Sequence, residues 1–91
     1  MSATVRIPTS LRSLTGGSSE VETPAGRLGD LINGLTIDYP DLGERLFDEG
    51  GDLRRFINVF VADEDIRFLD GLETTVSPGQ VVTILPAVAG G

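Results

Sequence analysis

The sequence predicts an α+β protein in which a mixed sheet of four to five strands packs against one main helix. Two observations carry this prediction. Alternating or β-branched segments, typical of strands, lie near both ends and in the second half of the 91-residue chain. A single stripe of apolar residues at helical spacing lies between them. A chain of this length forms one domain with one modest core. We expect residues 1–86 to form that domain and residues 87–91 to be a flexible tail.

The N-terminal segment is expected to form a hairpin with a long loop. Residues 4–8 alternate between apolar and polar side chains, and residues 20–22 alternate again around Val21. The intervening residues 15–19 are a cluster of Thr, Gly and Ser that is typical of a turn. Leu11 and Leu14 lie within the loop, and we expect both side chains to fold back onto the core.

The main helix is expected to begin near residue 28 and to end before Pro40. Five apolar side chains recur at the spacing of one helical face: Leu28, Leu31, Ile32, Leu35 and Tyr39. Pro40 ends the pattern because its ring cannot continue the helical turn and disfavours helix at the preceding residue. Residues 42–47 are long enough for one more short helical turn, and residues 48–52 read as a polar loop.

The second half of the chain carries the remaining strands. Residues 56–62 are the clearest strand, residues 66–68 are expected to form a short strand, and residues 80–85 form the last one before Pro86 closes it. The order is strand, strand, helix, strand, short strand, strand. We expect the first and last strands to lie side by side, which is the β-grasp arrangement.

Missing residue types exclude most routes to independent catalysis. The chain contains no Cys and no His, and all seven basic residues are Arg. These absences exclude a thiolate nucleophile, a Ser-His-Asp triad, a His- or Cys-ligated metal and a lysine Schiff base. An enzyme that uses only Ser or carboxylate side chains stays open, but we expect a protein that is not an enzyme by itself, with no bound cofactor and no metal site.

Charge and hydropathy set further expectations about partners and location. The formal net charge of −7 argues against nucleic-acid binding, which needs a basic surface. It either favours partners with a basic docking surface or only keeps a small domain soluble. No apolar run approaches the roughly 20 residues of a membrane span, and the N-terminus does not resemble a signal peptide. We expect a cytoplasmic protein that does not bind membranes.

Three stretches carry a resemblance to a known family. They are residues 56–68, the ending from Thr83 to the final Gly90-Gly91, and residues 6–12 followed by Thr15-Gly16-Gly17. Together with the strand order, they resemble the MoaD/ThiS sulfur carriers of the ubiquitin-like superfamily, and the N-terminal stretch is similar to their actinobacterial CysO group. The resemblance implies a ubiquitin-like β-grasp fold and a carrier that supplies sulfide for cysteine biosynthesis.

The resemblance also implies that Gly91 is the reacting residue. Its carboxylate would be adenylated and converted to a thiocarboxylate, while Gly90, Ala89, Val88 and Ala87 thread into a partner's site. Residue chemistry agrees with this role, because an α-carboxyl with a pKa of about 3.3–3.7 is an anion at neutral pH. Glycine leaves the terminal carbonyl unhindered, and five extended residues reach roughly 17 Å.

The partners that the resemblance implies are three proteins. An E1-like adenylyltransferase/sulfurtransferase would use ATP to activate the tail. A PLP-dependent cysteine synthase would accept the sulfur, and a zinc metalloprotease would release the cysteinyl product and regenerate the carrier. The PLP and the zinc would belong to those partners.

Two surface features are candidates for other roles. Phe60 and Leu85 face away from the helix side of their strands, so we expect them to form an exposed apolar patch for docking partners, bordered by Arg6. The acids at residues 63–65 lack the spacing of a calcium loop and are interpreted as a solvated turn.

Other functions remain open at this point. The same tail would suit the small subunit of molybdopterin synthase, which would show a stable complex with a large catalytic subunit. A protein modifier would instead form isopeptide bonds with lysines of its targets. Sulfur delivery for thiamine or for secondary metabolites is a further alternative.

Overall fold

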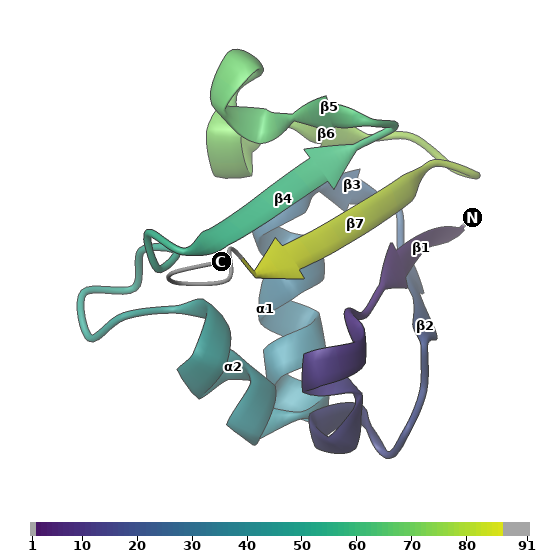
Figure 1. Cartoon of the computed structure of the whole chain (residues 1–91). Helices are drawn as coiled ribbons and strands as arrows, with labels where there is room; N and C mark the ends of the chain where they lie inside the picture. The colour runs from purple at the N-terminus through teal and green to yellow at the C-terminus, as the bar shows by residue number, and fades with distance from the viewer. Residues whose placement is uncertain (1, 87–91) are drawn as a thin grey trace.

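The computed structural model describes residues 2–86, and these form a mixed sheet with the two α-helices against one face (Figure 1). Met1 and the predicted tail, residues 87–91, lie outside the described residues. The five-stranded sheet has the order β2-β1-β7-β4-β5. Its strands are β1 (Ser2–Arg6), β2 (Glu20–Pro24), β4 (Ile57–Val61), β5 (Glu64–Asp65) and β7 (Val81–Pro86).

The first and last strands lie side by side, as the sequence predicts. β1 and β7 pair in parallel, with Val5 opposite Val82, whereas every other pairing in this sheet is antiparallel. A parallel pair needs a long crossover connection, and the two helices between β2 and β4 are part of it. The β-grasp prediction is therefore confirmed.

The long loop of the first hairpin contains a helix that the sequence did not predict. The 3-10 helix η1 covers Thr9–Thr15 and ends at Gly16 in the left-handed conformation. Its Leu11 side chain is buried, and Leu14 packs against the core, as expected. Thr15 is also buried, and its hydroxyl lies 3.2 Å from the Arg12 carbonyl oxygen and 3.0 Å from that of Ser18. That buried hydroxyl gives the loop a fixed shape.

Two helices cover the inner face of the sheet. Helix α1 (Leu28–Asp38) ends before Pro40, and Pro40 then begins α2 (Pro40–Leu46), which is longer than the single turn expected there. Proline suits the first turn of a helix because it has no N–H to leave unsatisfied. Gly43 lets α2 approach α1 closely, since a Cβ atom at this position would lie 3.0 Å from the Thr36 Cβ.

The segment after β4 differs from the prediction. Ala62 and Asp63 both have positive φ values, of 49° and 71°, and they turn the chain into β5, which pairs with the end of β4. The predicted short strand at residues 66–68 is wrong, because Ile66–Phe68 forms the 3-10 helix η2. The Asp65 carboxylate accepts a hydrogen bond from the Arg67 backbone N–H at 2.8 Å, which caps this helix and favours it over a strand.

A second, two-stranded sheet was also not predicted from the sequence. β3 (Gly26–Arg27) pairs with β6 (Thr75–Val76), next to the 3-10 helix η3 (Gly71–Glu73). Strands of two residues have no alternation to detect. The Arg27 guanidinium reinforces this junction, with Nε 2.7 Å and a terminal nitrogen 3.1 Å from the Glu73 carboxylate oxygens. These hydrogen bonds, with the favourable charge interaction, lower the pKa of Glu73.

The core lies between the sheet and the two helices. Both faces of the interface contribute buried aliphatic side chains, from Val5, Val59, Val82 and Ile84 on the sheet and from Leu28, Leu31, Ile32, Leu35, Leu42 and Leu46 on the helices. The alternation of β4 leaves Ile57, Val59 and Val61 buried and turns Asn58 and Phe60 to the other face. That uncovered side of the sheet is called the outer face below.

Candidate functional site

The end of β7 is the point from which the predicted working tail departs. β7 lies in the middle of the sheet, between β1 and β4, and its last residue, Pro86, is paired with Ile57. Buried Val82 and Ile84 anchor the strand from the inner side. The predicted reacting residue Gly91 and the threading residues Ala87, Val88, Ala89 and Gly90 lie outside the described residues. The sheet therefore fixes the position of the last residue before the tail.

The three predicted docking residues share the outer face. Strand register aligns Arg6 of β1 with Thr83 of β7 and aligns Thr83 with Phe60 of β4, in one row across the sheet. Leu85 lies in the next row, opposite Asn58, toward the end of β7. Leu85 is 46% exposed, whereas Phe60 is only partly exposed. The expected grouping of these side chains is therefore present, and Leu85 contributes its most accessible apolar surface.

Two exposed arginines flank this apolar patch. Arg6 lies on the β1 side, where its Nε is 3.5 Å from a carboxylate oxygen of Glu20. Arg67 lies on the β5 side, where it donates a hydrogen bond to the Asn58 side-chain oxygen and has its Nε 3.4 Å from Asp65 Oδ1. The sequence did not identify Arg67, because its position over β4 depends on the turn into η2. Each arginine has an acidic neighbour, so the outer face offers paired charges around an apolar centre.

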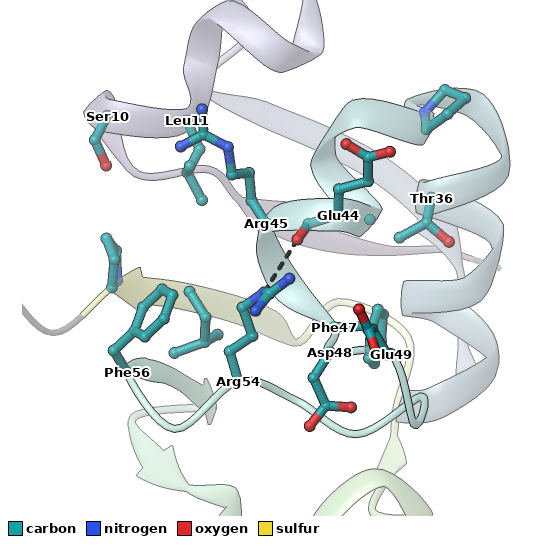
Figure 2. Close-up of a pocket in the computed structure, with 14 residues that line it drawn as sticks. Ser10, Leu11, Thr36, Glu44, Arg45, Phe47, Asp48, Glu49, Arg54 and Phe56 are labelled. Carbon is teal, nitrogen blue, oxygen red and sulfur yellow. Dashed lines mark hydrogen bonds between the residues drawn. The ribbon is translucent and has the colours of Figure 1, made fainter.

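A second surface feature adjoins Pro86. An open groove of about 1030 Å³ runs between η1, α2 and the segment before β4, and Pro86 lines it together with Phe56 (Figure 2). Arg54 and Arg45 supply positive charge there, and Figure 2 shows the Arg54 guanidinium directed at the Glu44 backbone oxygen, which accepts a hydrogen bond from Nε at 3.0 Å. Within residues 2–86, neither arginine forms an ion pair.

The groove was not identified from the sequence. The adjacent Arg54-Arg55 pair before a strong strand was the only available signal, and side-chain direction in a loop does not follow from spacing. The acidic side chains of Glu44, Asp48 and Glu49 line the same groove, so its two arginines do not make it basic overall.

Two acidic side chains of the described region stabilise local structure. Asp48 Oδ1 accepts hydrogen bonds from the backbone N–H groups of Gly50 and Asp52, at 2.9 and 3.1 Å. Asp65 caps η2, as described above. Within residues 2–86 there is no group of three or more acidic, His or Cys side chains that could hold a metal ion. No helix in that range is long and apolar enough to cross a membrane.

Comparison with known proteins agrees with this arrangement. The profile of the ThiS family matches residues 5–91. The chain is 50% identical to a protein of Mycobacterium tuberculosis described as "Sulfur carrier protein CysO". The alignment spans 93 residues and covers 100% of both chains.

Two solved structures extend the comparison. The crystal structure of the BexX/CysO complex of Amycolatopsis orientalis contains a chain that is 47% identical, with a TM-score of 0.89 over 98% of this chain and 99% of that one. The solution structure of small archaeal modifier protein 1 from Methanosarcina acetivorans is 30% identical, with a TM-score of 0.88 over 99% of this chain and 96% of that one.

Proposed function

The chain belongs to the ThiS family, and from that membership we propose that it is a sulfur carrier that acts through the terminal carboxylate of Gly91. The carrier is a cosubstrate of other enzymes and not itself a catalyst. Its carboxylate is adenylated, converted to a thiocarboxylate and used to donate sulfide for cysteine biosynthesis. The single observation that carries this proposal is the family match, which extends to residue 91 and so includes the tail.

Each step of the cycle has a defined bond change. A Gly91 carboxylate oxygen attacks the α-phosphorus of ATP, and pyrophosphate leaves. The terminal sulfur of a persulfide then attacks the acyl carbon, and AMP leaves. A thiol cleaves the resulting acyl disulfide, which leaves the thiocarboxylate on the carrier and a disulfide on the donor. The chain itself supplies the reacting carbonyl and contains no Cys to compete for the sulfur.

The fold supports this proposal because the surface proposed for docking belongs to the sheet, whereas the reacting residue belongs to the tail. Leu85 and Phe60 give a partner an apolar surface on the outer face, while β7 delivers the tail from the centre of the sheet. An E1-like adenylyltransferase/sulfurtransferase is the activating partner in this proposal and brings the ATP. A PLP-dependent cysteine synthase accepts the sulfur, and a zinc metalloprotease cleaves the product from Gly91.

The proposal is tested by intact-mass measurement after incubation with ATP, a sulfur donor and the activating enzyme. We expect the mass of the chain to rise by the replacement of one oxygen atom with sulfur. A chain that lacks only Gly91 is the matched control, and it should keep its fold and gain no sulfur. Sulfur transfer to this shortened chain, or no transfer to the complete one, would refute the assignment of Gly91.

A second candidate function is covalent modification of other proteins. The 30% identity to an archaeal protein described as a modifier favours it, since the same activated carboxyl could react with a lysine amine. Under this alternative, cell extracts with ATP would yield isopeptide-linked adducts between Gly91 and target lysines. If the thiocarboxylate forms and no such adducts appear, only the sulfur-carrier function is supported.

A further inference from the structure

β2 is an edge strand whose outer backbone has no strand beside it within the described residues. The register with β1 and the bond from the Ile7 N–H to the Ser19 carbonyl oxygen direct the backbones of Val21 and Thr23 toward β1. Backbone groups alternate in direction along a strand, so the N–H and C=O of Glu22 point away from the sheet. They are positioned to pair with another extended chain.

A groove follows this edge between β2 and α1. It has a volume of about 280 Å³, and its walls include Val21, Leu31 and Leu35. Thr23 also lines it, and this side chain is 7% exposed with a hydroxyl that has no hydrogen-bond partner among the described residues. A buried hydroxyl without a partner is unfavourable, so this wall of the groove is not fully satisfied by the folded chain alone.

Gly34 keeps the groove open. It lies within α1, where glycine is less favourable than alanine, and a Cβ atom built there would meet no atom within 4 Å. Packing within the described structure therefore gives no reason for a glycine. Gly34 does line the groove, where any larger side chain would occupy the space. The residue is explained if another chain approaches α1 closely at this point.

The rim of the groove is negatively charged. Glu22 and Asp38 both line it, and Asp38 is the last residue of α1, whose final turn has no basic side chain. The carbonyl ends of a helix carry partial negative charge, so Asp38 and the helix terminus together attract a cation. Arg27, the basic residue of the groove, is held by Glu73 and Asp30. The charge that complements this rim is positive.

We propose that the groove between β2 and α1 binds an extended segment of a partner protein that combines apolar side chains with a Lys or Arg. The segment adds a strand to β2 through the backbone of Glu22 and sets an apolar side chain over Gly34. Its cation lies near Asp38 and the C-terminal end of α1. Pro24 has no N–H to donate, so pairing is limited to the part of β2 that precedes it.

A second copy of this chain fits the edge poorly. Antiparallel pairing of two β2 edges about Glu22 would set the two Glu22 carboxylates opposite each other, and like charges across a strand pair are unfavourable. The groove also shares no lining residue with the groove at Pro86 and includes none of Arg6, Phe60 and Leu85. A bound segment would therefore leave the outer face and Pro86, the last described residue before the tail, uncovered.

Selection from a displayed library of short random peptides tests this proposal, with the complete chain as the target. We expect the enriched peptides to be apolar with a basic residue and to change the backbone amide NMR signals of Glu22, Thr23 and Gly34. Gly34→Leu should weaken the Kd of these peptides about tenfold or more, because it fills the space for one apolar side chain. Asn33→Leu is the matched control, since it adds the same side chain to α1 outside the groove.

Further measurements separate this site from the tail and from the outer face. Asp38→Asn should weaken binding about two- to fivefold, which is the usual strength of a charge at a helix end, whereas Asp41→Asn should not. Deletion of Gly91 should leave peptide binding unchanged, so a failure of the sulfur-carrier function is distinguishable from a failure of this site. The proposal is overturned if no peptide is enriched, if Gly34→Leu binds as tightly as the wild type, or if the NMR changes lie on the outer face. Self-association through β2 would also overturn it.

Discussion

Truncation of Leu85 to alanine should weaken activation of the carrier by its adenylating partner without unfolding it. Complete burial of a leucine side chain is worth about 1.5–3 kcal/mol. Leu85 is 46% exposed, so roughly half of that burial, ~1 kcal/mol, remains available to a partner that covers the outer face. A loss of ~1 kcal/mol corresponds to a rise of about fivefold in the KM for the carrier.

The assay is ATP–pyrophosphate exchange by the activating enzyme as the concentration of the carrier is varied. Ile37→Ala is the matched control, because Ile37 is 77% exposed on α1, on the side of the sheet opposite the outer face. If exposed apolar surface contributed to binding without regard to its position, Ile37→Ala would raise the KM more than Leu85→Ala. Docking through the outer face predicts that only Leu85→Ala raises the KM.

Denaturant unfolding of both variants completes the experiment. Leu85→Ala should lower the free energy of unfolding by about 1 kcal/mol, the share of burial that the folded chain already provides, and so remain folded. Equal KM values for the wild type and folded Leu85→Ala, or a larger effect of Ile37→Ala, would refute docking through this face.

Three further predictions concern single side chains. Thr15→Val removes the buried hydroxyl near the Arg12 and Ser18 carbonyl oxygens, and it should lower the free energy of unfolding by about 1–3 kcal/mol in a urea titration. Gly34→Ala should raise that free energy by about 1 kcal/mol in the same titration, because alanine favours helix and its methyl group meets no atom. The pKa of Glu73 is lower in the folded chain than in the unfolded chain, because ionised Glu73 interacts with Arg27. The interaction therefore contributes to the free energy of unfolding above the unfolded pKa of about 4.3, and this contribution is lost as the pH falls through the folded pKa. The difference in unfolding free energy between the wild type and Glu73→Gln should accordingly shrink on acidification, and a constant difference would contradict this assignment.

The strands and the main helix could be predicted because their signals are local and repeated. The alternation of residues 57–61 and the spacing of Leu28, Leu31, Ile32 and Leu35 each reflect burial of one face against the core. The same alternation predicted that Phe60 and Leu85 point away from the helices. The loop helix η1 and the pair β3–β6 were missed because neither shows a repeated pattern of apolar residues: η1 is held by side-chain contacts within its own loop, and each strand of the pair has only two residues.

The sequence by itself determined which chemistry this protein lacks and which terminal residues it offers. The absence of Cys, His and Lys and the presence of Gly90-Gly91 are read directly from the chain. Only the tertiary structure decided what surrounds the start of the tail. Arg54, Phe56 and Pro86 come together because β7 pairs with β4, and Arg67 reaches Asn58 because the chain turns after Val61. Such neighbours depend on strand register and loop direction, which are properties of the whole fold and have no counterpart in residue spacing.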